Sequence, residues 1–257
     1  MTKVALITGS TSGIGLGIAK KLASEGYHVI LNGLNTPDVP NVVKDVDALG
    51  PGEVLFSDAD MSNPGQIENM MHMIENKFGQ IDVVVNNAGI QFVSPVEEFP
   101  VEKWDKIIAI NLSSAFHIIR LAVPMMKKNG WGRIVNIASA HALVASPFKS
   151  AYVAAKHGIA GLTKAVAMEV AEHNITCNAV CPGYVRTPLV EGQIEATAKA
   201  RGITQEQVIK DVMLGEQPTK KFVDVNEIAD LVFFLASDSA ASMTGTCLPI
   251  DGGWTAH

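Results

Sequence analysis

Short apolar runs alternate with longer amphipathic segments along the whole chain. The apolar runs are rich in β-branched residues and end at Gly, Asn or Asp, which is typical of strands covered on both faces. They predict strands at residues 3–8, 28–32, 54–56, 81–86, 132–138, 176–180 and 246–250. The amphipathic segments predict helices at residues 13–25, 41–49, 64–78, 101–128, 151–172 and 225–237. This alternation predicts βαβ units, with right-handed crossovers between parallel strands.

The predicted architecture is therefore α/β: a single doubly wound, Rossmann-like domain over residues 1–257, with a seven-stranded parallel sheet and helices on both faces. Residues 186–224 interrupt the alternation, with two weak helical patterns near 189–200 and 204–214 and no strand pattern. Open α/β sheets bind ligands at the carboxyl ends of their strands. We therefore expect this insertion to form a small helical lid over a ligand.

A glycine-rich segment, residues 8–17, follows the first predicted strand and opens a helix. Its spacing departs from the G-x-G-x-x-G fingerprint, but glycines there still allow a tight turn, and a helix N-terminus favours the charge of a pyrophosphate. The segment therefore predicts a dinucleotide site. Its expected cofactor contacts are Gly9, Thr11, Ser12, Gly13, Ile14 and Gly15.

Four residues carry the candidate chemistry. Tyr152 and Lys156 are four apart near the start of a helix and so share one face. A neighbouring lysine cation and the positive ring of a bound oxidised cofactor are both expected to lower the pKa of the tyrosine, which could then accept a proton. Ser139 ends the fifth strand, and Asn111 lies inside a helical pattern, where asparagine marks a solvent-facing or functional position.

Together with the glycine loop and the segment Asn87-Ala88-Gly89, these four residues resemble the short-chain dehydrogenase/reductase family over essentially the whole chain. The resemblance implies that Tyr152 is the acid–base group, that Ser139 binds a substrate oxygen, and that Asn111 holds a water that relays protons through Lys156. Further cofactor contacts are implied at Asp60, Met61, Asn87, Ala88, Gly89, Tyr152, Lys156, Pro182, Gly183, Val185 and Thr187, of which Thr187 would anchor the nicotinamide. The ordinary alternative for this segment is a helix-capping loop, a role that fits Ser62 better than Asp60.

The end of the second strand bears on the choice of cofactor. Residues 31–35 contain neither the acid that reads a ribose nor an arginine, and no Lys or Arg occurs in residues 9–17. A 2′-phosphate would lack a charged partner there, which favours NAD. Asp38 either substitutes for the missing acid or is a solvated loop residue.

A set of polar residues near the catalytic group bears on the substrate. Taken singly, they are ordinary surface or loop residues, but together they supply a cation, an imidazole and amides, which suit a carboxylate. Their segments resemble the bacterial D-3-hydroxybutyrate dehydrogenases of that family. The resemblance implies interconversion of (R)-3-hydroxybutyrate and acetoacetate, a reaction of ketone body metabolism. The implied substrate contacts are Gln91, Ser139, His141, Lys149, Tyr152, Gln193 and Trp254, with Trp254 closing the pocket.

Two other functions stay open. A 3-oxoacyl carrier-protein reductase using NADPH would be expected to show an arginine after the second strand and a basic surface for its acidic carrier. A non-catalytic cofactor-sensing regulator would be expected to lack the tyrosine or the lysine. Neither pattern is found in the sequence.

Composition limits the possible partners and the location of the protein. The net charge of −6 argues against a large basic surface that would bind nucleic acid or an anionic membrane. No secretory signal pattern and no apolar run long enough to span a bilayer are found, and residues 228–236 are typical of a core helix. The three cysteines lack metal-ligand spacing, so reduced thiols, no metal site and a cytoplasmic location are expected.

The 151–172 helix carries small residues that permit close helix packing: Ala154, Ala155, Ala160 and Gly161. Since members of the resembled family usually form tetramers through such helices, a homotetramer is expected.

Overall fold

The computed structural model describes residues 2–256 and contains one seven-stranded sheet in the order β3-β2-β1-β4-β5-β6-β7. All neighbouring strands are parallel. The strands are β1 (Val4–Ile7), β2 (His28–Asn32), β3 (Val54–Ser57), β4 (Val83–Asn86), β5 (Gly132–Ile137), β6 (Ile175–Pro182) and β7 (Cys247–Ile250). The order reverses between β1 and β4, and ligands bind at such a reversal in doubly wound sheets. The predicted fold class is confirmed.

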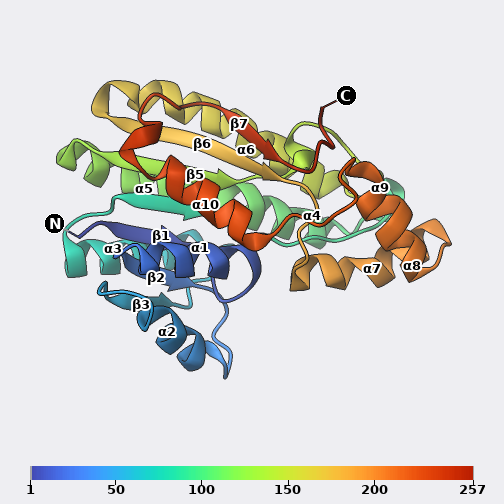
Figure 1. Cartoon of the computed structure of the whole chain (residues 1–257), viewed down its shortest axis with the longest axis horizontal. Helices are drawn as coiled ribbons and strands as arrows, with labels where there is room; N and C mark the ends of the chain where they lie inside the picture. Colours follow the sequence, from blue (N-terminus) through green and yellow to red (C-terminus); the bar gives the residue numbers. More distant parts are fainter. Residues whose placement is uncertain (1, 257) are drawn as a thin grey trace.

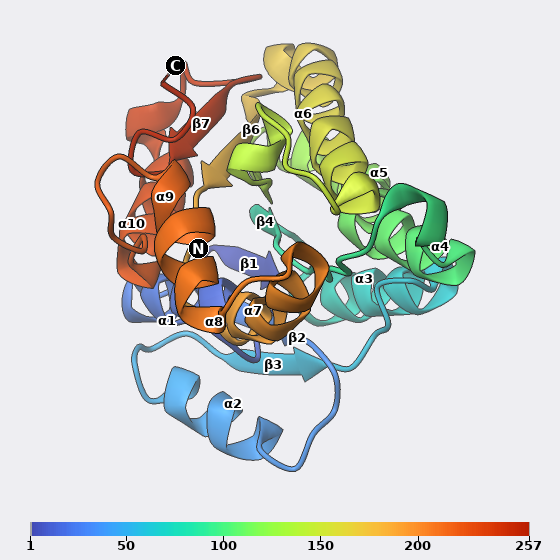
Figure 2. The same ribbon diagram turned by 90° about the vertical axis from the view of Figure 1, so that its right-hand side faces the viewer.

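Helices cover both faces of the sheet (Figures 1 and 2). One face carries α1 (Gly13–Ser24), α2 (Val39–Asp47) and α10 (Val225–Leu235). The other face carries α3 (Pro64–Phe78), α5 (Ser114–Asn129) and α6 (Ser150–Val170), while α4 (Val101–Ile108) leads into α5.

The strands supply side chains to both layers, because successive residues of a strand point to opposite faces. In β1, Ala5 and Ile7 pack in the cluster that contains α1 and α10. Val4 and Leu6 pack in the cluster that contains α3 and α5. This explains why the strands are apolar throughout instead of alternating with polar positions.

The predicted helix at 101–128 is not continuous, because a π-helical turn, Ala109–Ser113, separates α4 from α5. The complete stretch Val101–Asn129 is long and apolar enough to cross a membrane by length and composition, which the sequence prediction missed. Its buried residues, such as Ile118 and Ala122, pack in the cluster with α3 and the sheet, as those of a core helix do. Short 3-10 turns that were not predicted occur at Val96–Glu98, Ala140–Ala142, Ala171–His173 and Asp238–Ala240.

The insertion at residues 186–224, here called the lid segment, lies beyond the carboxyl ends of the strands (Figure 1). It consists of α7 (Pro188–Arg201), α8 (Gln205–Gln207), a π-helical turn (Val208–Met213) and α9 (Leu214–Glu216). At its base, Val185 forms an isolated parallel bridge with Val223. The lid segment packs through its own small cluster, in which Val208 and Met213 contact the Tyr184 and Trp254 region. The predicted helical lid is thus present.

Candidate active site

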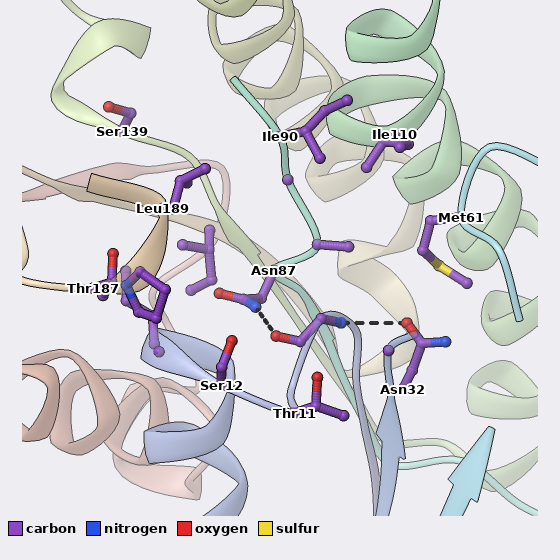
Figure 3. A pocket seen from close by; sticks show the side chains of 18 of the residues that line it. Thr11, Ser12, Asn32, Met61, Asn87, Ile90, Ile110, Ser139, Thr187 and Leu189 are labelled. Atoms are coloured by element: carbon purple, nitrogen blue, oxygen red, sulfur yellow. Dashed lines mark hydrogen bonds between the residues drawn. The ribbon is translucent and has the colours of Figure 1, made fainter. Parts of the chain in front are cut away.

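A cavity of about 510 Å³ opens where the strand order reverses, between the glycine loop and the lid segment (Figure 3). It is lined by every expected cofactor residue except Gly15: Gly9, Thr11, Ser12, Gly13, Ile14, Asp60, Met61, Asn87, Ala88, Gly89, Tyr152, Lys156, Pro182, Gly183, Val185 and Thr187. Gly15 instead allows close packing, since a Cβ there would lie 2.9 Å from Cα of Ser10. Thr187 also starts α7 as its N-cap.

The glycine loop is fixed by the segment after β4. Gly9 has a left-handed φ of +61°, and a Cβ there would lie 2.8 Å from Cα of Ala88, so only glycine fits. Oγ1 of Thr8 accepts hydrogen bonds from the backbone N–H groups of Asn87 (3.0 Å) and Ala88 (2.9 Å). The Asn87 amide donates to the carbonyls of Thr8 (2.8 Å) and Gly9 (2.9 Å; Figure 3). Asn87 therefore acts by joining the two loops.

The turn after β2 presents no free charge to the cavity. Asn32 accepts a hydrogen bond from Gly9 N (3.3 Å) and donates to the carbonyls of Ser57 (3.1 Å) and Ala59 (3.0 Å) at and just after the end of β3, so its amide is occupied by the protein itself. Leu34 lines the cavity and is 75% exposed. Asp38 does not line the cavity; it precedes α2 and accepts a hydrogen bond from a side chain three residues later (3.2 Å). This position favours the alternative that Asp38 is a solvated loop residue.

The loop after β3 holds Asp60 and Met61 against the cavity, as expected. Oδ1 of Asp60 accepts from the backbone N (2.8 Å) and hydroxyl (2.7 Å) of Ser62, and these bonds lower the pKa of the carboxyl group. The expected cap at Ser62 is wrong. Asn63 is the N-cap of α3, because its side chain accepts from two backbone N–H groups of the first turn.

Tyr152, Lys156 and Ser139 line the same cavity. Lys156 is buried, and its ammonium donates to the carbonyl of Ile137 (2.7 Å) and lies 5.5 Å from the centroid of the Tyr152 ring. Desolvation lowers the pKa of Lys156 to about 8. It raises the pKa of Tyr152 to about 12, against the lowering effect of a hydrogen bond with Ser139. Without a bound cofactor, desolvation outweighs the lowering of the Tyr152 pKa expected from Lys156. The lowering expected from an oxidised cofactor stays a prediction.

Asn111 is buried in the π-helical turn, so the solvent-facing alternative is wrong. Its Oδ1 accepts from the backbone N of Ile90 (2.9 Å), and its Nδ2 donates to the carbonyl of the same residue (3.0 Å). Asn111 thereby ties the segment after β4 to the helix. Its role in a proton relay stays a prediction.

A second cavity, of about 50 Å³, adjoins the first and shares five lining residues with it: Ser139, Tyr152, Gly183, Leu189 and Val190. The expected substrate residues that line it are Ser139, His141, Lys149, Tyr152, Gln193 and Trp254. Gln91 lines neither cavity, although its amide is buried and has no hydrogen-bond partner within residues 2–256. Gln193 donates to the carbonyl of Leu189 (3.0 Å) within α7.

Lys149 is the only lysine of the small cavity and is 7% exposed, so the alternative of a solvated loop charge is wrong. Its ammonium donates to the hydroxyl of Tyr184 (3.1 Å). Within residues 2–256, no carboxylate lies within ion-pair distance of it. Burial, with a smaller effect from Arg201, lowers its pKa to about 8. The preceding Phe148 has a left-handed φ of +67°, and strain of this kind is typical of functional sites.

Aromatic rings enclose the remainder of the small cavity. His141 is buried, and desolvation lowers its pKa to about 3, so the imidazole is neutral. Its Nδ1 lies 3.3 Å from the hydroxyl of Ser139, and its Nε2 has no partner within residues 2–256. Trp254 packs edge-on against His141 (centroids 5.0 Å apart) and stacks on Tyr184 (5.3 Å, interplanar angle 8°). The sequence interpretation missed Tyr184, whose only signal is an aromatic residue directly after the Pro-Gly turn.

A glycine loop at the reversal of a parallel sheet, beside a tyrosine–lysine pair, defines an oxidoreductase of the nicotinamide-dependent Rossmann class. A sequence profile of the family described as enoyl-(acyl carrier protein) reductase matches residues 9–255. The chain belongs to the short-chain dehydrogenase/reductase family, which confirms the sequence prediction.

Three similar proteins illustrate this membership. The chain is 62% identical to a D-beta-hydroxybutyrate dehydrogenase of Rhizobium meliloti, over 100% of both chains. It is 52% identical to a D-beta-hydroxybutyrate dehydrogenase of Cupriavidus necator, over 99% of this chain and 98% of the relative. The crystal structure of a variant actinorhodin polyketide ketoreductase with NADPH matches with a TM-score of 0.94 at 32% identity, over 100% and 98% of the two chains.

Proposed function

We propose that the protein reversibly oxidises (R)-3-hydroxybutyrate to acetoacetate with NAD. The observation that carries the proposal is the buried Lys149 ammonium, which has no carboxylate partner within residues 2–256 and shares the small cavity with Tyr152. A buried charge needs a counter-charge, and a substrate carboxylate supplies one. The cavity of about 50 Å³ favours a short acid over a steroid or a long acyl chain.

Different side chains bind the two ends of the substrate. Lys149 pairs with the carboxylate, and the neutral His141 and the amide of Gln193 offer further hydrogen bonds to it. At the other end, Ser139 and Tyr152 hold the hydroxyl oxygen of the substrate. NAD, when bound along the large cavity, supplies the hydride acceptor and a positive ring that favours the phenolate form of Tyr152. Tyr152 takes the hydroxyl proton as the C=O bond forms, and Lys156 keeps a positive charge beside it.

The cofactor preference rests on the turn after β2. Neither Asn32, whose amide is occupied, nor the exposed Leu34 offers a positive partner to a 2′-phosphate. We expect kcat/KM to be higher with NAD than with NADP when both are measured at saturating hydroxy acid. Equal values would contradict this interpretation of the turn.

The two alternatives have less support. A 3-oxoacyl carrier-protein reductase has no use for a buried lysine at the substrate end, and the two relatives named D-beta-hydroxybutyrate dehydrogenase favour the main function. A cofactor-sensing regulator has no need of the assembled Tyr152, Lys156 and Ser139 group.

The setting of the enzyme is part of the proposal. The three cysteines are free thiols, which supports a reducing compartment such as the cytoplasm, where the reaction would serve ketone body metabolism.

Phe116 on α5 and Met168 on α6 are 49% and 84% exposed, and this apolar exposure supports assembly through these helices into a homotetramer. No role in binding nucleic acid or a membrane is proposed.

The test is direct. The purified protein is incubated with NAD and either (R)- or (S)-3-hydroxybutyrate, and the absorbance of NADH is followed. We expect rapid reduction with the (R) acid only. A Lys149→Ala variant should raise KM for the acid about ten- to a hundredfold, whereas NAD affinity and the slow oxidation of butan-2-ol should stay unchanged. An equal loss on acid and alcohol would make Lys149 structural and contradict the proposed carboxylate site.

A further inference from the structure

Gln217, at the end of the lid segment, is fully buried (0% exposed) yet lines neither cavity. A buried amide has several donors and acceptors to satisfy. Its Oε1 accepts a hydrogen bond from the backbone N of Tyr184, and its Nε2 donates to the carbonyl of Lys221. Gln217 thus bridges the segment directly after β6 to the last residues of the lid segment.

Two neighbouring segments reinforce this bridge. The backbone N of Val223 donates to the carbonyl of Tyr184 (2.9 Å), so Tyr184 is held through both its N–H and its C=O. A Cβ at Gly183 would overlap Oε1 of Gln217 and lie 2.9 Å from Cα of Asp251. The three chain segments therefore meet around the Gln217 side chain with no room for further atoms.

The fixed backbone of Tyr184 determines where its ring lies, and this ring lines the small cavity. Its hydroxyl accepts the hydrogen bond from Lys149 (3.1 Å), and its face stacks on Trp254 (5.3 Å). A shift of the Tyr184 backbone would therefore move the wall of the cavity together with the hydrogen-bond partner that the Lys149 ammonium has within residues 2–256.

We propose that Gln217 is a positioning residue for the substrate carboxylate, acting through Tyr184 on Lys149 and Trp254. This inference rests on the proposed function, because it assumes that Lys149 binds the carboxylate. It makes Gln217 a determinant of preference for hydroxy acids over plain alcohols, although its side chain touches neither substrate nor cofactor.

The test uses Gln217→Met, which keeps the length of the side chain and removes both hydrogen bonds. We expect kcat/KM for (R)-3-hydroxybutyrate to fall about tenfold, chiefly through KM, because the anchor loses its orientation. Oxidation of butan-2-ol and the Kd for NADH should stay within about twofold. The matched control is Gln207→Met, which breaks the capping box of α8 in the same lid segment without a bond to Tyr184. It should leave both substrates within about twofold of wild type.

Two further variants test whether Gln217 acts through Tyr184. In a Tyr184→Phe background, which already lacks the bond to Lys149, Gln217→Met should cost much less than tenfold if the two residues act along one route. If Gln217→Met does not fold, Gln217→Glu replaces it; this variant keeps the acceptor for Tyr184 N, and we expect a smaller loss confined to the acid. An equal loss on acid and alcohol, or wild-type selectivity in Gln217→Met, would overturn the inference.

A readout without substrate separates this inference from the proposed function. The stacked Tyr184–Trp254 pair should contribute a near-ultraviolet circular dichroism band that is assigned by its absence in Trp254→Phe. Gln217→Met should weaken this band, and Gln207→Met should not. If wild type shows no preference for the hydroxy acid, the proposed function fails, and the band alone decides whether Gln217 positions Tyr184.

Discussion

Desolvation shifts four ionisable side chains around the substrate end of the site toward their neutral forms. The pKa of Lys149 and that of Lys156 are both lowered to about 8, the pKa of His141 is lowered to about 3, and the pKa of Tyr152 is raised to about 12. A group held near the midpoint of its titration responds strongly to a charge placed beside it. In the proposed function, the carboxylate of the substrate and the positive ring of NAD are the charges that these groups respond to.

Replacement of Tyr152 tests its role as the proton acceptor. Tyr152→Phe removes only the hydroxyl, so turnover should fall by about 10²–10⁴-fold, while the thermal midpoint and NADH affinity stay close to those of wild type. The matched control is Tyr27→Phe, at a buried tyrosine in the core cluster of α1, which should keep its activity. Retention of more than about a tenth of the turnover in Tyr152→Phe would remove this residue from the assigned role.

The pKa of Lys149 predicts a pH dependence with a defined sign. The ammonium is charged below pH 8 and neutral above it, so the preference for acid over alcohol should be largest below pH 8 and decline above it. The measurement is the ratio of kcat/KM for (R)-3-hydroxybutyrate to that for butan-2-ol, in which the titrations of Tyr152 and Lys156 cancel. Lys149→Arg stays charged, so its ratio should be flat with pH. A wild-type ratio that rises above pH 8 would refute the assignment of Lys149.

The sequence identified the residue types of the site but not their environments. Tyr152, Lys156 and Ser139 were found because their order and spacing carry the family pattern, and the structure brings them together. The burial of Lys149 depends on a lid segment and on Tyr184, which are distant from it in sequence. Local patterns cannot report such burial, so the desolvation that raises the pKa of Tyr152 in the protein alone was not predicted.

Among the elements, the π-helical turn at Asn111 has a defined structural task that can be tested. Asn111→Leu would leave the backbone N–H and C=O of Ile90 without their partner. We expect the free energy of unfolding to fall by about 1–3 kcal/mol, and NADH to bind more weakly, because Ile90 lines the cofactor cavity. Denaturant titration and a fluorescence Kd would measure the two effects.

A matched variant at an exposed asparagine tests whether the loss of stability comes from the bonds between Asn111 and Ile90. Asn41→Leu removes an exposed side chain from α2 that forms one hydrogen bond with Asp38. Its unfolding free energy should change by less than about 0.5 kcal/mol. If both variants behaved alike, the bonds to Ile90 would not hold the segment after β4.

The bounds of an element were predicted well where a single hydrophobic pattern runs along its whole length. The seven strands and the long helices were predicted because each buries a continuous apolar face. The π-helical turn was not, because its one extra residue leaves the 3.6-residue pattern on both sides readable as one helix. The lid segment gave weak patterns because it packs on a small cluster of its own around Val208 and Met213, apart from the sheet.

For the molecule as a whole, the hydrophobic pattern determines the layers but not which outer surfaces are covered by a partner. The 151–172 segment was expected to offer four small residues for close packing. Ala155 and Ala160 are buried inside the protomer, which corrects half of that expectation, whereas Ala154 and Gly161 are exposed. A Cβ at Gly161 would meet no atom within 4 Å, so its surface is open to another chain.

The tetramer prediction rests on this open surface and on the exposed Phe116 and Met168 of the same helical layer. At micromolar concentration, light scattering should give a mass four times the 27.3 kDa of the chain. Gly161→Glu should lower the mass to that of a dimer or monomer, because a charge would be buried at a close helix contact. Gly192→Glu is the matched control, since Gly192 is also a helical glycine with open space around it, but on the lid segment. A monomeric wild type, or an equal loss of mass in both variants, would show that α6 does not form the contact.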